Sequence, residues 1–442
     1  MNQSEQQNGS PPGGEVFRLA EHFFRHEAGK VVSWLTGVFG MERLQWAEDV
    51  VQEALVKALQ TWPYYGIPKN PAGWITQTAK NLALDLIRRE KVFRKKESQI
   101  AALIESSAGA SAGTGDATFE TEITDERLRL MFACCHPLVP REAQTALALK
   151  TLCGFSPAEI AKAFLTSEAA IAKRLTRARQ KIRELQIPFE IPSGAELVPR
   201  LDSVLETLYL LFNEGYKASY GESLVKEELC REAIRLGALL AEHPVGNQPR
   251  THALLALMCL NAARLPERVD SEGNILCLKE QDRARWDRAM IARGILHLGH
   301  SASGDEVSVY HLQAGIAACH CTASDYASTD WPQILALYDG LVGIDDSPVV
   351  ALNRAVALAN VQGPRAGLEA LAAMPNRHAL DSYYLYYAVL AEFENELQEF
   401  DAAAGHLRNA LKLTELRSEQ LLLRRRLESC AEQSLTSAQS PN

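Results

Sequence analysis

Apolar side chains recur at helical spacing along most of this chain. In residues 46–62 and 71–91 they lie three and four residues apart, as on one face of an amphipathic helix. Residues 154–184 and most of 197–430 show the same spacing. No run of alternating β-branched residues predicts a strand. The pattern therefore predicts an all-α fold.

Changes in composition divide these helices into domains. Residues 15–97 and 124–187 are predicted to form two helical domains, joined by a small-residue, flexible linker at 98–123. Two prolines and a glycine near residue 190 mark a second boundary. An Ala/Leu-rich helical domain is predicted to follow at 197–430.

A helix-turn-helix pattern lies in residues 154–184. Ser156 and Glu159 have the spacing of a capping box, and Pro157 suits the first helical position. After a short turn, Ser167 is placed to cap a longer helix. That helix has an apolar stripe made of Ile171, Leu175, Ala178 and Ile182.

The opposite face of the longer helix is basic. Residues 162–183 hold seven Lys or Arg residues and one acid, Glu168. Such a face is either an ordinary solvated surface or a surface for the DNA major groove. The capped turn in front of it favours DNA. The side chains expected to meet phosphates or base edges are Lys173, Arg174, Arg177 and Arg179.

The segment SEAAIAKRLTRARQKIR resembles region 4 of the extracytoplasmic-function sigma factors, within the sigma-70 family of RNA polymerase subunits. The resemblance implies contact with the −35 promoter element. Residues 169–172 are Ala-Ala-Ile-Ala where the family often has Gly-Thr-Val-Lys, so no base preference is carried over. The implied −35 residues are Ser167, Glu168, Lys173, Arg174, Arg177 and Arg179.

Two segments of the first domain resemble region 2 of the same family. DVVQEALVKA is similar to the helix that binds core RNA polymerase, which implies that role for Asp49, Gln52 and Glu53. PAGWITQTAKNLALDLIRRE is similar to the helix that melts the −10 element, and a basic run follows at 88–96. The loop at 61–70 corresponds to the place that holds a flipped base, where Tyr64 and Tyr65 also offer stacking surface. The implied −10 residues are Trp62, Asn70, Trp74, Lys80, Asn81, Asp85, Arg88 and Arg89; for Trp74 a role in the core remains an alternative.

The last domain resembles a C-terminal extension, with tetratricopeptide-like helices, found in one subgroup of these sigma factors. Ala403, Leu407 and Ala410 occupy packing positions of the second helix of such a repeat. The polar residues at 281–287 and 330–331 suit pinning of helices better than catalysis. No nucleophile–base pattern, P-loop or HExxH motif appears, so the chain is not expected to be an enzyme.

Charge separates the domains further. Residues 1–189 carry a net +3, from 24 basic and 21 acidic residues, and the remainder carries −12, from 22 and 34. This asymmetry favours nucleic-acid contact by the first part only. No apolar run is long enough to span a membrane, and residues 1–14 do not form a signal peptide, so a cytoplasmic location is expected.

The nine cysteines suggest no cofactor. Their tight clusters, Cys134-Cys135-His136 and Cys319-His320-Cys321, lack the paired spacing of zinc ligands. Buried free thiols are the better interpretation, and neither a metal nor another cofactor is predicted.

These features together imply a sigma factor whose partners are core RNA polymerase and promoter DNA. The acidic domain is expected to modulate activity, with intramolecular contact with the sigma domains as one route. A stand-alone helix-turn-helix regulator with a sensing domain is the alternative, and an enzyme on a helical scaffold is disfavoured.

Overall fold

The computed structural model of the protein is built from helices. It describes residue 23 and residues 28–89, 125–164, 166–187, 194–218 and 225–438. Within these ranges the one β element is an isolated bridge between Val269 and Ile275, which confirms the all-α prediction. The predicted linker at 98–123 and most of the basic run, residues 90–96, lie outside the described residues.

The chain forms two compact units. The first comprises residues 1–207 with 243–245, and the second comprises residues 208–242 with 246–442. Each unit is described by itself.

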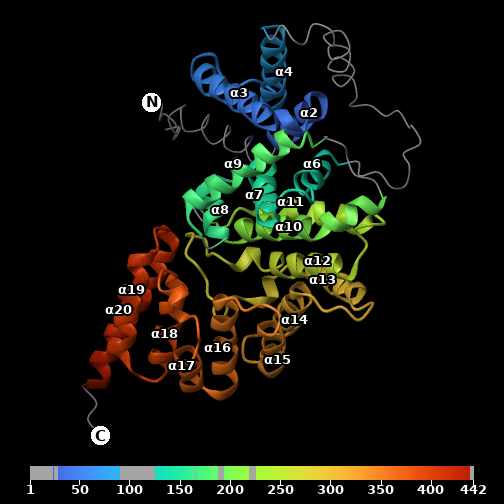
Figure 1. Ribbon diagram of the computed structural model, residues 1–442. Helices are drawn as coiled ribbons and strands as arrows, with labels where there is room; N and C mark the ends of the chain where they lie inside the picture. Colours follow the sequence, from blue (N-terminus) through green and yellow to red (C-terminus); the bar gives the residue numbers. More distant parts are fainter. Residues whose placement is uncertain are drawn as a thin grey trace, which may run out of the picture. The chain divides into compact units, whose positions relative to one another are not determined.

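The first helices of unit 1 form a small bundle (Figure 1). Their bounds are α2 (Ala28–Phe39), η1 (Met41–Arg43), α3 (Leu44–Tyr65) and α4 (Pro71–Arg89). The buried face of α3 includes Val50, Ala54 and Ala58, as its periodicity predicts. Ile75, Ala79 and Ala83 form the fully buried stripe of α4, four residues apart.

Four further helices of unit 1 follow: α6 (Glu126–Cys134), α7 (Arg141–Cys153), α8 (Pro157–Ala163) and α9 (Glu168–Glu184). Ten of the thirteen residues of helix α7 are buried. This helix supplies the surface against which α6, α8 and α9 pack. A 3-10 turn, η3 (Gly194–Arg200), then leads into α10 (Leu201–Tyr216).

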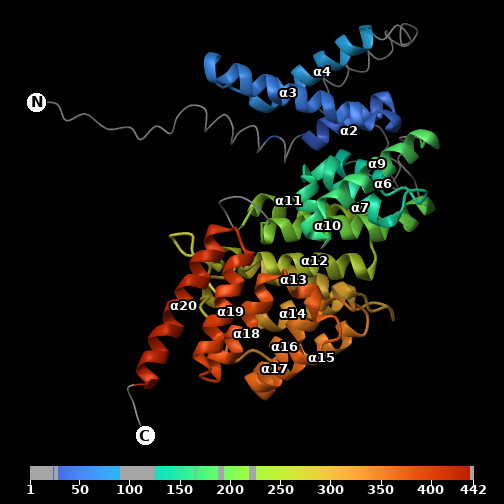
Figure 2. The same ribbon diagram turned by 60° about the vertical axis from the view of Figure 1, so that its left-hand side comes forward.

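Unit 2 is a series of helices, each packed on the next along the chain (Figure 2). Their bounds are α11 (Glu227–Glu242), α12 (Pro249–Ala262), α13 (Arg288–Ser301), α14 (Val309–Thr322), α15 (Trp331–Val342), α16 (Pro348–Gln362), α17 (Pro364–Ala372), α18 (Tyr384–Glu396), α19 (Phe400–Leu413) and α20 (Arg417–Ala438).

The expected repeat-like pair is α18 and α19. Ala403, Leu407 and Ala410 are buried, in one apolar cluster with Ala388 and Ala391 of α18. Small side chains at these positions let the two helix backbones approach closely. The preceding pair, α16 and α17, also packs closely, as neighbouring helices of a helical repeat do.

The polar residues at 281–287 hold structure together, as expected. The buried Arg283 guanidinium donates to the His320 carbonyl at 2.8 Å and to Thr329 Oγ1 at 2.9 Å. Asp287 and Asp330 cap α13 and α15 by accepting from backbone N–H groups. These side chains are therefore used in capping and in pinning helices.

Candidate nucleic-acid and polymerase interface

Helices α8 and α9 form the predicted helix-turn-helix. Ser156 Oγ accepts from the Glu159 amide at 3.1 Å, and the Glu159 carboxylate accepts from the Ser156 amide at 2.7 Å, which completes the capping box. Ser167 caps α9 by accepting from the Ala170 amide at 3.3 Å. The buried residues of α9 are Ile171, Leu175, Ala178 and Ile182, the predicted stripe.

The basic residues of α9 do not share one environment. Lys173 and Arg177 are exposed, as are Ser167 and Glu168 at the start of the helix. Arg174 is half-buried and pairs with Glu142 of α7 at 2.8 Å. Arg179 is more deeply buried, at 18% side-chain exposure. The outward positive charge of this helix is therefore carried by Lys173, Arg177, Lys181 and Arg183, with the half-buried Arg174 beside them.

Helix α3 presents a polar outer face. Asp49, Gln52 and Glu53 are all exposed, on the side opposite the buried Val50 and Ala54. Lys57 lies 3.9 Å from Glu53 across one helical turn, a weak exposed pair. The three polar side chains thus remain accessible to a partner surface.

The prediction of a loop beginning at residue 61 is wrong, because α3 continues to Tyr65. Trp62 lies inside the helix and is 2% exposed, with its ring edge-on to Trp74 at 5.6 Å. Burial of this indole stabilises the α3–α4 corner and leaves it no open face for an unstacked base. The exposed rings are Tyr64 and Tyr65, at 83% and 86%.

Helix α4 begins at an amide cap and carries the remaining −10 candidates. Asn70 Oδ1 accepts from the Gly73 amide at 2.9 Å, which gives Asn70 a structural role in addition to any contact with DNA. Trp74 is half-buried against Trp62, and the Lys80 ammonium lies 4.7 Å from the Trp34 ring centroid. Asn81 and Asp85 are exposed, and Arg88 and Arg89 are the last residues of the helix.

One carboxylate joins the two helical groups of unit 1. Glu48 of α3 accepts from Thr151 Oγ1 of α7 at 2.6 Å and from Arg179 Nη2 of α9 at 2.6 Å. The exposed fractions of Glu48 and Arg179 are 12% and 18%. Sequence reasoning missed Glu48, which looked like one of several acids on an amphipathic helix. No local pattern could show that its partners lie 103 and 131 residues further on.

Close backbone approach occurs between the same helical groups. A Cβ on Gly29 of α2 would lie 2.6 Å from the carbonyl oxygen of Leu152 at the end of α7. Ser33 Oγ, also on α2, donates to the Glu126 carbonyl of α6 at 2.9 Å. These contacts bury α2 against α6 and α7, so the helices before and after residues 90–124 share one core.

The segment that follows α9 also packs into unit 1. Arg200, 7% exposed, donates to the Phe132 carbonyl of α6 at 3.1 Å. Arg141 of α7 and Glu206 of α10 lie 3.6 Å apart. Residues 194–207 therefore cover α6 and α7, although composition had assigned 197–207 to the separate C-terminal domain.

The cysteine clusters are packing features. Cys134, Cys135 and Cys321 are buried thiols, and burial raises the pKa of each. Burial and two nearby arginines lower the pKa of His320 to about 3. Among the described residues neither cluster belongs to a group with metal-ligand geometry.

Three family matches cover consecutive parts of the chain. Residues 23–92 match Sigma-70 region 2, residues 129–182 match Sigma-70 region 4, and residues 200–302 match a family of unknown function, DUF6596. The first contains α2–α4, and the second runs from within α6 to within α9, in the order that the motifs had indicated. The third begins where η3 meets α10.

Two curated proteins are similar to this chain. An uncharacterized protein of Rhizobium meliloti (strain 1021) is 35% identical over 397 residues, which are 90% of this chain and 92% of that protein. A probable RNA polymerase sigma factor, RfaY, of Xanthomonas campestris pv. campestris is 29% identical over 138 residues, 31% of this chain and 33% of that protein. No solved structure matches.

A capped helix-turn-helix with a basic recognition helix, preceded by a helical bundle with a polar outer face, defines a DNA-binding transcription initiation factor. The chain belongs to the sigma-70 family of RNA polymerase sigma factors, in the extracytoplasmic-function-like form that carries a C-terminal helical extension. Within the part of the chain that the structure describes, no helix has both the length and the apolar character needed to cross a bilayer.

Proposed function

We propose that this sigma factor binds core RNA polymerase through the outer face of α3 and directs it to promoters through α4 and α9. The observation that supports core binding is the exposure of Asp49, Gln52 and Glu53 on a helix whose other face is buried. Exposed acids and an amide beside an apolar core suit a basic partner surface. They are not needed for the fold of the helix itself.

Promoter contact is proposed for two surfaces. On α9, Lys173, Arg174 and Arg177 lie next to the capped N-terminal turn, where a recognition helix meets base edges and phosphates. On α4, Lys80, Asn81 and Asp85 lie on the matched −10 helix, with Tyr64 and Tyr65 as exposed stacking surfaces near its start. Ser167 and Glu168 precede the first group, and Arg88 and Arg89 follow the second.

For the C-terminal extension we propose a scaffolding role. Its first residues, 194–207, supply the buried Arg200 and the Glu206 carboxylate to α6 and α7. Removing the extension would expose α6 and α7 to solvent, and α8 and α9 of the helix-turn-helix pack against α7. This packing favours scaffolding over masking of the DNA-binding surface.

Binding to purified core RNA polymerase tests the proposal. The double variant Asp49→Lys/Glu53→Lys should lose about 2 kcal/mol of core affinity, roughly 30-fold, and should lose run-off transcription with it. The matched control is Asp401→Lys/Glu415→Lys, which makes the same change of charge at exposed acids of unit 2. Equal core affinity of both folded variants and the wild type would reject the α3 surface.

The same assay separates the alternative function. A stand-alone helix-turn-helix regulator would bind promoter DNA but would not co-purify with core enzyme. The match of residues 23–92 to region 2 favours the sigma-factor role. Run-off transcription on a library of genomic promoters would then identify the sequences it reads.

A further inference from the structure

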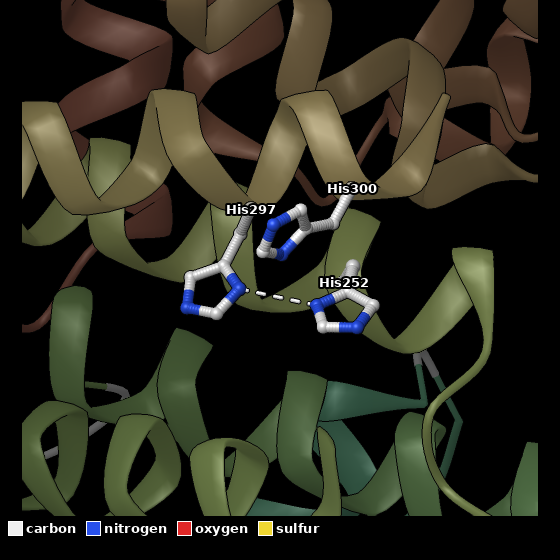
Figure 3. A group of neighbouring side chains, drawn as sticks. All are labelled: His252, His297 and His300. Carbon is white, nitrogen blue, oxygen red and sulfur yellow. Dashed lines mark hydrogen bonds between the residues drawn. The ribbon is translucent and has the colours of Figure 1, made fainter. Parts of the chain in front are cut away.

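Three histidines of unit 2 meet at the packing surface of two helices. His252 belongs to α12, and His297 and His300 belong to α13. Each histidine offers one ring nitrogen, and these three nitrogens all lie within 4.8 Å of one another. Figure 3 shows an edge of the His252 ring directed toward an edge of the His297 ring, with the His300 ring beside them.

The helix pair brings these side chains together for simple geometric reasons. His297 and His300 are three residues apart, and so lie on one face of α13. Helices α12 and α13 pack closely, because a Cβ on Gly294 would lie 2.7 Å from Leu260 Cγ. The absence of that Cβ lets the α13 backbone approach α12 one turn before His297.

The two inner rings are already arranged as a pair of ligands. His252 Nδ1 and His297 Nδ1 are 3.1 Å apart, while the ring centroids are 5.3 Å apart, so the rings meet edge to edge. If an ion lay 2.0–2.1 Å from both nitrogens, the N–ion–N angle would be about 100°, near the tetrahedral value. A modest turn of each ring about χ2 would direct both lone pairs to that point.

The outer nitrogen of His252 fixes its protonation. His252 Nε2 lies 2.9 Å from Asn247 Oδ1, and because that oxygen only accepts, Nε2 carries the proton. Nδ1 then accepts from His297 Nδ1–H, and an ion bound between the two rings would replace that proton, which moves to His297 Nε2. Metal-binding histidines are commonly oriented by this kind of outer hydrogen bond.

We propose that His252, His297 and His300 form a binding site for a divalent transition-metal ion, with Zn²⁺ as the first candidate. Neutral imidazoles suit zinc, copper and nickel, whereas Mg²⁺ and Ca²⁺ prefer oxygen ligands. With three protein ligands the ion keeps a position for water or a small anion. The exposed His300 places that position at the solvent side of the cluster.

Burial and neighbouring positive groups favour the neutral form of the His252 and His297 rings. Burial, His252, Arg293 and His300 together lower the pKa of His297 to about 4, and burial and His300 lower the pKa of His252. Arg293 also repels a dication, whereas the C-terminal end of α13, where His297 and His300 lie, attracts one.

The site has a structural consequence that does not depend on polymerase binding. It would tie the first turn of α12 to the last turn of α13, the helices at the end of the DUF6596 match. Metal bound to the folded state raises the melting temperature of that state. The folded C-terminal extension would then be more stable when the metal is abundant than when it is scarce.

The test uses the untagged full-length chain, treated with chelator and titrated with Zn²⁺ against a chromophoric competitor. One equivalent should bind, with a rise in melting temperature, and Co²⁺ should give the absorption bands of a low-coordinate nitrogen site. His297→Ala and His300→Ala should each weaken Zn²⁺ binding at least ~10-fold, and Asn247→Ala should weaken it ~10-fold through His252. The matched control, His378→Ala, removes an exposed histidine at 81% exposure and should change neither value.

Two results would overturn the proposal. The first is that neither Zn²⁺ nor Co²⁺ binds at micromolar metal concentration. The second is that the metal binds but His297→Ala and His300→Ala leave its affinity unchanged. His300→Ala keeps the test decisive if His297→Ala fails to fold, because the His300 side chain is exposed. Loss of binding on His378→Ala alone would assign the metal to a surface histidine instead.

Discussion

Arg179 of the recognition helix α9 donates a 2.6 Å hydrogen bond to the carboxylate of Glu48 on α3. Both side chains are mostly buried, and Thr151 donates to the second oxygen of the same carboxylate. A basic residue expected to meet DNA is thus occupied inside the protein. Before Arg179 could reach a phosphate, it would have to leave Glu48, and the helices of regions 2 and 4 would have to separate there.

Breaking this pair should loosen unit 1. Glu48→Ala leaves the Arg179 guanidinium buried without its counter-charge, and should lower the free energy of unfolding by about 2–3 kcal/mol. Glu53→Ala, on the exposed face of the same helix, should cost less than about 0.5 kcal/mol. Denaturant unfolding followed by circular dichroism measures both. Equal, small effects would mean that the Glu48–Arg179 pair contributes nothing to holding the helices together.

Arg174 should contribute to sequence recognition. Arg174→Ala is expected to weaken promoter binding by ~1–3 kcal/mol and to relax preference at one position of the −35 element, if its guanidinium forks onto a base. Binding to a set of single-base promoter variants measures this. A uniform loss over all sequences, with a shallower salt dependence, would instead assign Arg174 to a phosphate. The companion variant is Glu142→Gln, which removes the negative charge that lies 2.8 Å from Arg174.

The C-terminal extension should be required for activity. A chain ending after Pro192 lacks Arg200, and leaves the Phe132 carbonyl and the buried Cys135 uncovered. We expect less run-off transcription than from the full chain at every salt concentration. Greater transcription, most visible at low salt where charge attraction is least screened, would support masking instead. The full-length variant Arg200→Met isolates the contribution of the buried guanidinium.

His320 should make stability depend on pH. Burial holds its pKa near 3 in the folded chain, against an ordinary value of 6.5. Below pH 6.5 the unfolded state therefore binds a proton that the folded state refuses, so stability falls as the pH decreases from about 6.5 towards 3. His320→Gln should flatten part of this decline in thermal melts between pH 7 and pH 5. The exposed-site variant His378→Gln should leave the slope unchanged.

Much of the fold was predictable because its signals are local. The capping box at Ser156, the cap at Ser167 and the apolar stripe of α9 depend on residues within a few turns of one another. The end of α3 was not predictable in this way. Pro63 and Gly66 suggest an early loop, but burial of Trp62 against Trp74 of the next helix stabilises the helix to Tyr65.

The sequence by itself determined the helices, their polar and apolar faces, and the family to which the regions 2 and 4 motifs belong. Helical periodicity and caps act over three to eleven residues, so they can be read along the chain. Only the tertiary structure decided that Glu48 binds Arg179, that Arg200 covers α6, and that His252 meets His297 and His300. Those contacts join residues 45 to 131 positions apart, because side-chain packing, which no local spacing records, selects their partners.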